Sequence, residues 1–441
     1  GATALALIAR KAQSRLILSR AKHPSLTGHV RMAKRLARLM PAYGFEGQRF
    51  FASDDADAAL AARRRDGFAR LAATFRERYR ETRRVTAEVR SGLSDLQFTS
   101  RYRVPFQYRD MVGRELGLGT FVARTEGPWL VDLDGNRAFD CTGAYGVNVL
   151  GWDYYKRNLH EAEEEARTLG PVLGAYHPSV ADNVARLRAI SGLDEVSFHM
   201  SGTEAVMQAV RLARHHTGRR RLVRFSGAYH GWWGDVQPGI GNPVAEDDTL
   251  TLAEMSERTL ECLAERSDIA CVLVNPLQAL HPNGAAPSDG SLVDGSRSAG
   301  FDKAAYTEWL RRLREVCTAR GIVLILDEVF LGFRLAPGGA QAYFGVKADL
   351  VTYGKTLGGG LPVGVLCGRA DLMRRFNEAR PGDICFARGT FNAHPYVMCA
   401  MNAFLRNLDR PETRALYADL DARWDARVGM LNGRLAEEGL P

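Results

Sequence analysis

From about residue 150 onward, short apolar segments alternate with longer helical ones, and this alternation constrains the fold more than any other feature. Strands that are apolar on both faces and joined by helices are typical of a mainly parallel sheet covered by helices on both sides. The predicted fold class is therefore α/β, and a chain of 441 residues has room for more than one domain. Six segments are predicted to be strands: 195–200, 221–227, 269–276, 321–330, 350–355 and 362–368.

Two of these strands end in charged residues. Residues 321–330 read GIVLILDEVF, so Asp327 and Glu328 come at the end of a buried strand. Residues 351–364 read VTYGKTLGGGLPVG, with Lys355 just before three glycines. Glycines permit close approach of another body, so Lys355 is expected to face a bound group. An acid capping the next turn, or a plain ion pair, explains these residues too; alternatively, carboxylate and lysine hold the two ends of one aromatic cofactor.

Two further segments supply what such a cofactor needs. Residues 199–210 (HMSGTEAVMQAV) lead from a strand into a helix, whose amino end attracts a phosphate; an ordinary helix N-cap explains the same residues. Residues 224–233 (RFSGAYHGWW) place Tyr229 and His230 just after another strand, where an aromatic ring could be stacked. Each signal is weak alone, and the cofactor interpretation rests on all four occurring at strand ends of one sheet.

The first hundred residues differ from the rest in charge. They hold 20 Lys and Arg against 9 Asp and Glu, whereas the remaining 341 hold 39 against 42. Residues 1–95 have helical spacing throughout and are predicted to be a basic helical extension. Its charge favours an acidic protein or an anionic surface as partner, and a solvated helical face is the alternative. Nucleic acid is not expected, because no stacking aromatics lie among the nine basic residues of the first forty.

The cysteines and the hydropathy pattern predict a cytoplasmic protein. Seven cysteines are scattered without CxxC spacing, which is typical of free thiols in a reducing compartment and predicts no metal site. No uncharged apolar run approaches the roughly 18 residues that a membrane span needs, and no secretory signal is evident.

The sequence resembles the class III (ornithine-type) aminotransferases, and most of all their glutamate-1-semialdehyde aminomutase branch. The similar segments are SGTEAVMQAVRLAR, AYHG, RGTF and the block from LILDEVF to LGGGLPVG, within about residues 110–441. The resemblance implies pyridoxal 5'-phosphate as cofactor, fold type I with a large and a smaller α/β domain, and a homodimer whose active site lies at the subunit interface. It implies a catalytic role for Lys355 as the Schiff-base lysine, for Asp327 as partner of the pyridine nitrogen, and for Tyr229 as an aromatic on one face of the ring.

The resemblance also implies the remaining cofactor contacts. Val329 matches the residue on the other face of the ring, with His230 beside Tyr229. Phosphate ligands are expected from Ser201, Gly202 and Thr203, and Thr390 is expected to reach across from the second subunit. Gln278 matches a glutamine near the phenolic oxygen. Where the sequence departs from the family pattern, a substrate pocket is predicted from Tyr145, Trp232 and Trp233.

The expected domains follow from this resemblance. Residues 96–150 are assigned to the small domain, 151–378 to the large cofactor-binding domain, and 379–441 to the start of the C-terminal small domain, which looks shortened. The first hypothesis for function is an aminotransferase that moves an amino group from an amino-acid donor to an aldehyde or ketone through a Lys355 aldimine and a pyridoxamine form. The acceptor is of acyl or polyketide type, or bound to an acidic carrier protein. The alternatives are a glutamate-1-semialdehyde-type aminomutase and, less favoured, a catalytically idle scaffold.

Overall fold

The computed structural model describes residues 2–102, 104–117, 119, 121–244, 248–277 and 302–439. The chain packs as two units, one made of residues 1–37 and 157–441 and the other of residues 38–156. We call them the sheet unit and the helical unit and describe each by itself.

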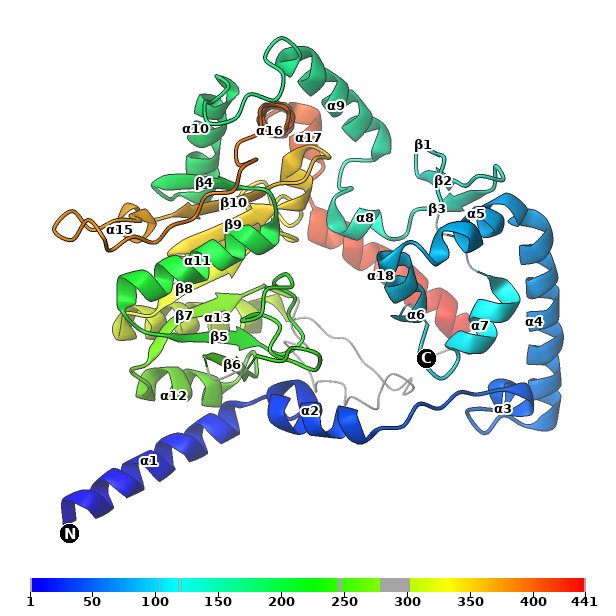
Figure 1. The fold of residues 1–441 in the computed structure, drawn as a ribbon, viewed down its shortest axis with the longest axis horizontal. Coiled ribbons are helices and arrows are strands. Elements are labelled where there is room, and N and C mark those ends of the chain that lie inside the picture. The colour runs from blue at the N-terminus through cyan, green and yellow to red at the C-terminus, as the bar shows by residue number, and fades with distance from the viewer. Residues whose placement is uncertain are drawn as a thin grey trace. The chain divides into compact units, whose positions relative to one another are not determined.

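The sheet unit is built on seven strands in the order β4-β10-β9-β8-β7-β5-β6 (Figure 1). All run parallel except β10, which pairs antiparallel with both β4 and β9. The prediction of a mainly parallel sheet is therefore confirmed. The strands are β4 (Glu195–His199), β5 (Arg221–Phe225), β6 (Thr249–Leu252), β7 (Ile269–Val274), β8 (Val323–Asp327), β9 (Leu350–Gly354) and β10 (Gly364–Gly368).

Strand β6 was not predicted. Its residues TLTL were read as loop and as the beginning of a helix, but all four are buried beside β5 and the helix α12 begins only at Glu257. On its other side β6 meets residues from the N-terminus: Lys22 forms an isolated bridge with Leu252, and the Ala253 amide donates to the Ala21 carbonyl at 2.9 Å. A short polar-apolar alternation becomes a strand here because a distant segment covers its outer edge.

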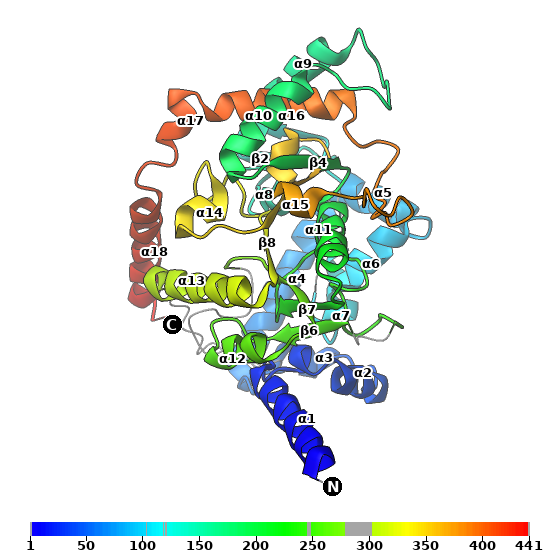
Figure 2. The same cartoon turned by 90° about the vertical axis from the view of Figure 1, so that its left-hand side faces the viewer.

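Helices cover both faces of this sheet. Figure 2 shows α11 (Gly202–Thr217) and α13 (Lys303–Arg320) on opposite sides of the strands. Under α11 lies the main hydrophobic core, which includes Val206, Leu222 and Ile325. The unit also contains α1 (Ala2–Ala21), η1 (Leu26–Gly28), α2 (Val30–Leu39, which continues past residue 37), α10 (Ser179–Ser191), α12 (Glu257–Glu265), α14 (Gly339–Phe344), η3 (Lys355–Gly358), α15 (Ala370–Met373), α16 (Pro395–Leu408), α17 (Pro411–Ala415) and α18 (Leu420–Glu437).

The N-terminal residues do not form one extension with the rest of the basic segment. Residues 1–37 belong to the sheet unit, where α1 packs against α12, and residues 38–95 belong to the helical unit. The packing units thus differ from the predicted boundaries at 95, 150 and 378. Because packing does not test which parts serve the cofactor, that functional division stays a prediction.

The helical unit combines helices with a small antiparallel sheet of order β1-β2-β3. Strands β2 and β3 form a hairpin, and Gly135 in the turn between them adopts a φ of 82°. The elements are α3 (Gly47–Phe51), α4 (Ala58–Arg78), α5 (Arg80–Arg90), α6 (Ser94–Tyr102), α7 (Arg109–Leu116), β1 (Arg124–Glu126), β2 (Trp129–Val131), β3 (Arg137–Phe139) and α8 (Gly143–Gly146); α9 (Trp152–Ala166) continues into the sheet unit.

The seven cysteines are free thiols, and all but Cys141 are buried, as their scattered spacing predicted. Within the described ranges, no helix has an apolar stretch of the length that a bilayer crossing requires.

Candidate active site

Six parallel strands of the sheet unit end at one edge, which we call the carboxyl edge. The registers place His199 of β4 and Gly354 of β9 on either side of Gly364, and Asp327 of β8 opposite Thr352 of β9. The segments predicted to carry chemistry follow directly after these strands: Ser201–Thr203, Asp327–Val329, Lys355 and Tyr229–His230. Ligands of open α/β sheets bind at this edge, so the topology brings the candidate residues to one region.

Asp327 is buried and held by three donors. Its Oδ1 accepts from the Val329 amide and the Thr352 hydroxyl, both at 3.1 Å, and its Oδ2 accepts from His230 Nδ1 at 2.8 Å. A carboxylate with this many donors is fixed in orientation. Thr352 was missed from the sequence, although a threonine in an otherwise apolar strand was the signal that could have revealed it.

His230 is fully buried, and this burial lowers its pKa even though the hydrogen bond to Asp327 opposes the change. The ring is therefore neutral at physiological pH. Because the carboxylate can only accept, Nδ1 donates to Asp327 and Nε2 is left as an acceptor. Nε2 is buried and has no hydrogen-bond partner in the described part of the chain. A buried polar atom without a partner indicates a place for a ligand group or a water.

Glu328 has a different role from its neighbour Asp327. Its carboxylate accepts from the amides of Ala340 (2.7 Å) and Gln341 (3.1 Å), and it lies so close to Gly339 that a Cβ there would be 1.9 Å from Oε2. Burial raises the pKa of Glu328 to about 7, against the effect of the two amides. Turn capping thus applies to both acids, since Asp327 Oδ1 accepts from the Val329 amide, but Asp327 also accepts from Thr352 and His230.

Lys355 is held in an unusual backbone conformation. Its φ is 48°, in the left-handed region where a residue other than glycine costs roughly 1–2 kcal/mol. Its Nζ lies 5.9 Å from the centre of the Phe330 ring and makes no hydrogen bond or ion pair with any described residue. Burial lowers the pKa of Lys355; the charge of Asp327 opposes this, and that of Arg334 adds to it. The amine is therefore easier to deprotonate than a solvated lysine.

The three glycines after Lys355 serve the packing of the fold itself. Gly359 adopts a φ of 61°, and a Cβ there would lie 2.3 Å from Asn158 Nδ2 and 2.4 Å from the Ala400 carbonyl oxygen. Asn158 Nδ2 donates to the carbonyls of both Gly359 and Ala400. The body that approaches Gly359 so closely is therefore α9 and α16. The close approach that glycine permits is thus used by the protein itself at Gly359, and the expectation that Lys355 faces a bound group stays a prediction.

Two hydroxyl residues at the amino end of α11 have different roles: Ser201 caps the helix, and Thr203 is available to bind an anion. Ser201 is the N-cap and accepts from the Glu204 amide at 3.3 Å, while Glu204 accepts from the Met200 amide at 2.8 Å. The Thr203 hydroxyl and the amides of Gly202 and Thr203 have no hydrogen-bond partner among the residues that the structure describes. Capping and anion binding are therefore compatible, because different groups are available for each.

Close packing joins this helix end to the other strand-end segments. A Cβ on Gly202 would lie 2.6 Å from Val329 Cγ1, and one on Gly354 would lie 3.1 Å from the same atom. A Cβ on Gly231, whose φ is 92°, would lie 2.3 Å from the Thr203 hydroxyl oxygen. Val329 and Thr203 are thus fixed beside the backbone of segments that follow three different strands.

The aromatic candidates differ in their surroundings. Tyr229 is 59% exposed, and its carbonyl accepts from Asn275 Nδ2 at 3.1 Å. Trp232 is 79% exposed, whereas Trp233 packs against the core beneath α11 and is the weaker pocket candidate. The Asn275 Oδ1 is buried and has no partner in the described segments. The sequence indicated Asn275 only as a departure from the family pattern, not as the residue that holds the Tyr229 backbone.

The predicted roles of three further residues are not tested by this geometry. Thr390 is exposed on a turn of the sheet unit, and its predicted role in a second subunit is untested. Tyr145 lies in the helical unit, 75% exposed and with a φ of 54°. Gln278 lies outside the described residues.

The residues at the carboxyl edge fit the cofactor that the sequence resemblance implies. Within the described residues, buried His230 Nε2 and Asn275 Oδ1 lack partners, Asp327 is a carboxylate held by three donors, and the end of α11 offers two amides and a hydroxyl for a phosphate. Lys355 supplies a half-buried amine of lowered pKa at the end of the neighbouring strand. A cation at one end and a fixed carboxylate at the other would hold an aromatic aldehyde with a ring nitrogen.

Among the described residues, one cluster has the spacing that a metal ion would need. Glu165, His177 and Cys399 offer three ligand atoms within 4.8 Å of one another. However, His177 Nδ1 already accepts from the Ser179 amide at 3.2 Å, and burial raises the pKa of Cys399 to about 11. This arrangement caps α10 and needs no ion.

Comparison with known proteins agrees with this site. Residues 113–428 match the family described as aminotransferase class-III. The glutamate-1-semialdehyde 2,1-aminomutase of Desulfotalea psychrophila is 35% identical over 334 residues, which cover 70% of this chain and 72% of the relative. Among solved structures, a transaminase with PLP bound is 28% identical (TM-score 0.61, 79% of this chain and 81% of that one), and a β-phenylalanine aminotransferase from Variovorax paradoxus is 29% identical (TM-score 0.61, 84% and 79%). The chain therefore belongs to the class-III aminotransferases, and its cofactor is pyridoxal phosphate.

Proposed function

We propose that this protein transfers an amino group from an amino-acid donor to an aldehyde or ketone, with Lys355 and Asp327 as its catalytic pair. The observation that carries the proposal is the position of these two residues at the ends of the adjacent parallel strands β9 and β8. Lys355 is a partly buried amine that has no partner among the described residues, and Asp327 is a buried carboxylate held in one orientation. Bound pyridoxal phosphate supplies an electron sink that stabilises the negative charge left when the substrate loses its α-proton.

In this proposal the protein groups hold and move protons. Asp327 keeps a proton on the ring nitrogen of the cofactor, and His230 keeps Asp327 in place by donating to Oδ2. Lys355 binds the cofactor and, when its amine is free and neutral, removes the α-proton of the substrate. The lowered pKa of Lys355 supports this second role, because a general base works best when its pKa lies near the working pH.

The remaining cofactor contacts are assigned by the same logic. The Gly202 and Thr203 amides and the Thr203 hydroxyl bind the phosphate, with Ser201 shaping the helix end through its capping bond. Val329 and Tyr229 would pack against the two faces of the ring. Gln278 and Thr390 complete the set by resemblance alone, Thr390 from a second subunit.

An aminomutase that shifts the amine within one substrate is the second candidate. The relative with 35% identity carries that name, whereas the solved structures at 28% and 29% identity are transaminases. The exposed rings of Tyr229 and Trp232 favour an acceptor with an apolar part. A carrier-bound acyl acceptor has weaker support: it rests on the charge of residues 1–95, and residues 1–37 of that segment pack against the sheet unit.

A half-reaction on the purified holoenzyme separates the two candidates. Single amino acids would be added one at a time while the absorbance band of the bound cofactor and the formation of a keto acid are followed. A transferase loses the band with one donor and releases the matching keto acid. A mutase converts an amino aldehyde by itself and releases none, and that result would overturn the proposal.

The dimer assignment is tested by mixing two variants, Lys355→Ala and Thr390→Ala. If Thr390 serves the site of the second subunit, a mixed dimer contains one intact site, and the mixture is more active than the mean of its parents. If Thr390 acts only within its own chain, mixing restores nothing. Each parent alone serves as the control.

A further inference from the structure

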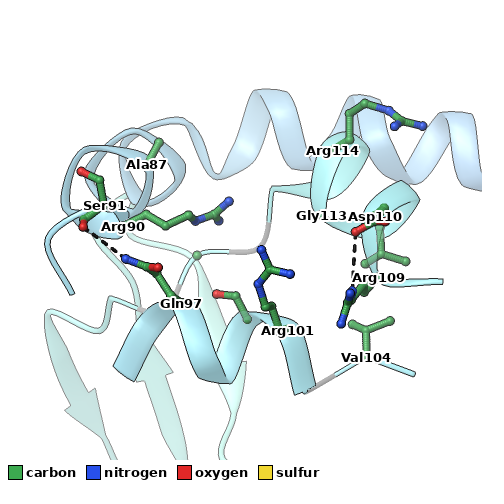
Figure 3. Close-up of a pocket in the computed structure, with 13 residues that line it drawn as sticks. Ala87, Arg90, Ser91, Gln97, Arg101, Val104, Arg109, Asp110, Gly113 and Arg114 are labelled. Atoms are coloured by element: carbon green, nitrogen blue, oxygen red, sulfur yellow. Dashed lines mark hydrogen bonds and ion pairs between the residues drawn. The ribbon is translucent and has the colours of Figure 1, made fainter. Parts of the chain in front are cut away.

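The helical unit contains a cavity whose charge is not matched by the protein. It has a volume of about 920 Å³ and lies among the end of α5, the helix α6 and the helix α7 (Figure 3). Four arginines line it, Arg90, Arg101, Arg109 and Arg114, against one acidic residue, Asp110. No residue assigned to the cofactor lines this cavity, so what binds here is separate from the proposed function.

The arginines differ in how well the protein satisfies them. Arg109 Nε lies 3.6 Å from Asp110 Oδ1, too far for a hydrogen bond, and Arg114 lies 3.4 Å from Glu115. Arg90 and Arg101 make no ion pair or hydrogen bond with any residue of the described ranges. Figure 3 shows both of their guanidinium groups turned into the same space, and Arg114 turned away from it.

Two guanidinium nitrogens are buried without a hydrogen-bond partner among the described residues, although one of them, Arg109 Nε, lies within ion-pair distance of Asp110. Both Arg90 Nε and Arg109 Nε are hidden from solvent and lack an acceptor in the structure described. Burying a donor of a charged group without an acceptor costs more than leaving a neutral one unpaired, so such atoms are rare in folded proteins. Two of them on the wall of one cavity indicate a missing acceptor that carries negative charge.

The cavity also has room and apolar surface beyond what a simple ion needs. Pockets of about 300–1,000 Å³ hold organic ligands of moderate size, and a phosphate ion would fill only a small part of this one. Ala87, Val104 and Val112 contribute apolar wall. Guanidinium groups bind phosphate through two parallel hydrogen bonds, and several arginines around one site favour a dianion over a monoanion.

We propose that this cavity binds an organic phosphate, with Arg90 and Arg101 as the principal ligands of the phosphate group and Arg109 as a third. The apolar wall holds the organic part. Asp110 opposes the ligand by its charge, so it sets an upper limit on affinity.

The test is calorimetric titration of the full chain with its cofactor bound, at low ionic strength, where charge interactions are least screened. The probes are n-butyl phosphate, inorganic phosphate and glutarate. Because the resident cofactor occupies its own phosphate site, binding of n-butyl phosphate reports a second site. We expect a Kd below about 1 mM for n-butyl phosphate and weaker binding of the other two.

Matched variants locate the binding. Arg90→Gln and Arg101→Gln should each weaken n-butyl phosphate at least about tenfold, since each removes a charged hydrogen bond. Arg84→Gln is the control, because Arg84 lies on the same helix α5 but pairs with Glu81 and Glu88 and does not line the cavity. Asp110→Asn should tighten binding, and it keeps the test valid if an arginine variant fails to fold.

Four outcomes would overturn the proposal. The first is that n-butyl phosphate does not bind to the wild-type protein. The second is that the arginine variants bind it as tightly as wild type does, because the ligand then lies elsewhere. The third is that Asp110→Asn weakens its binding. Glutarate binding more tightly than n-butyl phosphate would show that the cavity takes carboxylates instead.

Discussion

The carboxyl edge of the sheet and the arginine cavity both contain polar groups without partners, but only the first also contains a fixed opposite charge. Asp327 is held by three donors, and near it lie two nitrogens, His230 Nε2 and Lys355 Nζ, that have no hydrogen-bond partner among the described residues. No acidic group of the described residues is hydrogen-bonded to Arg90 or Arg101. A mixed site of this kind can orient a ligand and move protons on it, whereas a set of like charges calls for a counter-charge from outside. Replacing a charged side chain should therefore lower activity at the carboxyl edge of the sheet, whereas in the arginine cavity it should raise the stability of the fold.

The largest expected effect comes from Lys355→Ala. Loss of the amine removes both the covalent hold on the cofactor and the proposed base, so turnover should fall by about a thousandfold or more. Alanine is no better suited to the φ of 48° than lysine, so the fold should be retained. Mass spectrometry after borohydride reduction checks the attachment. The exposed Lys347→Ala is the control, and a cofactor still fixed covalently in Lys355→Ala would refute the assignment.

The next effect compares two neighbouring carboxylates. Asp327→Asn keeps the shape but removes the charge opposite the cofactor nitrogen, and should lower turnover by about a hundredfold or more with the protein still folded. Glu328→Gln should lower the midpoint of thermal unfolding instead, because it weakens the two bonds from Ala340 and Gln341. Measuring the turnover and the midpoint of thermal unfolding of both variants shows which carboxylate serves catalysis and which serves stability. If Glu328→Gln reduced turnover more than Asp327→Asn, the two roles would have to be exchanged.

The sequence was informative at the carboxyl edge because of its local pattern. An apolar strand followed at once by a polar residue places that residue at the edge, as with Asp327, Lys355 and Tyr229. The sequence was less informative wherever a distant segment decides the outcome. Strand β6 depends on residues 21 and 22 at its outer edge, and Gly359 is approached by α9 and α16, which follow from no local pattern.

The arginine cavity of the helical unit is a second feature that could not be predicted from the sequence. Arg90, Arg101 and Arg109 are about ten residues apart on three helices, and spacing alone cannot show that they face one space. In the sequence, Arg90 counted only toward the basic charge of the N-terminal extension, and Arg101 and Arg109 fell within the segment assigned to the small domain. What separates a solvated charge from a site is the burial of Nε without an acceptor, which only the packing reveals.

A third prediction concerns Glu254, a buried acid of the sheet unit that has no cation beside it. Burial raises its pKa to about 8, although Tyr306 donates to Oε1 at 2.6 Å. The unfolded chain releases this proton near pH 4.5 and the folded one near pH 8, so this residue makes the protein less stable as pH rises between those values. Glu254→Gln should match wild type near pH 4 and be more stable near pH 8, by at most about 1.4 kcal/mol per pKa unit.

Urea unfolding at several pH values measures this difference. Glu261→Gln, on the exposed side of α12, is the control and should leave the pH dependence as in wild type. A constant difference between Glu254→Gln and wild type across this range would mean that the acid is already ionised in the folded protein, contrary to its burial.

The smallest effect tests the cavity without any ligand. Arg90→Gln removes one of several like charges that the protein does not compensate, so the free energy of unfolding should rise by about 0.5 kcal/mol at low salt. Added salt screens the same repulsion, so the gain should shrink as ionic strength increases. Arg84→Gln on the same helix loses its bonds to Glu81 and Glu88 and should change stability in the opposite direction. Thermal unfolding of both variants at low and high salt provides the comparison. A loss of stability in Arg90→Gln would mean that the guanidinium is satisfied within the fold, and the contrast between the two regions would then disappear.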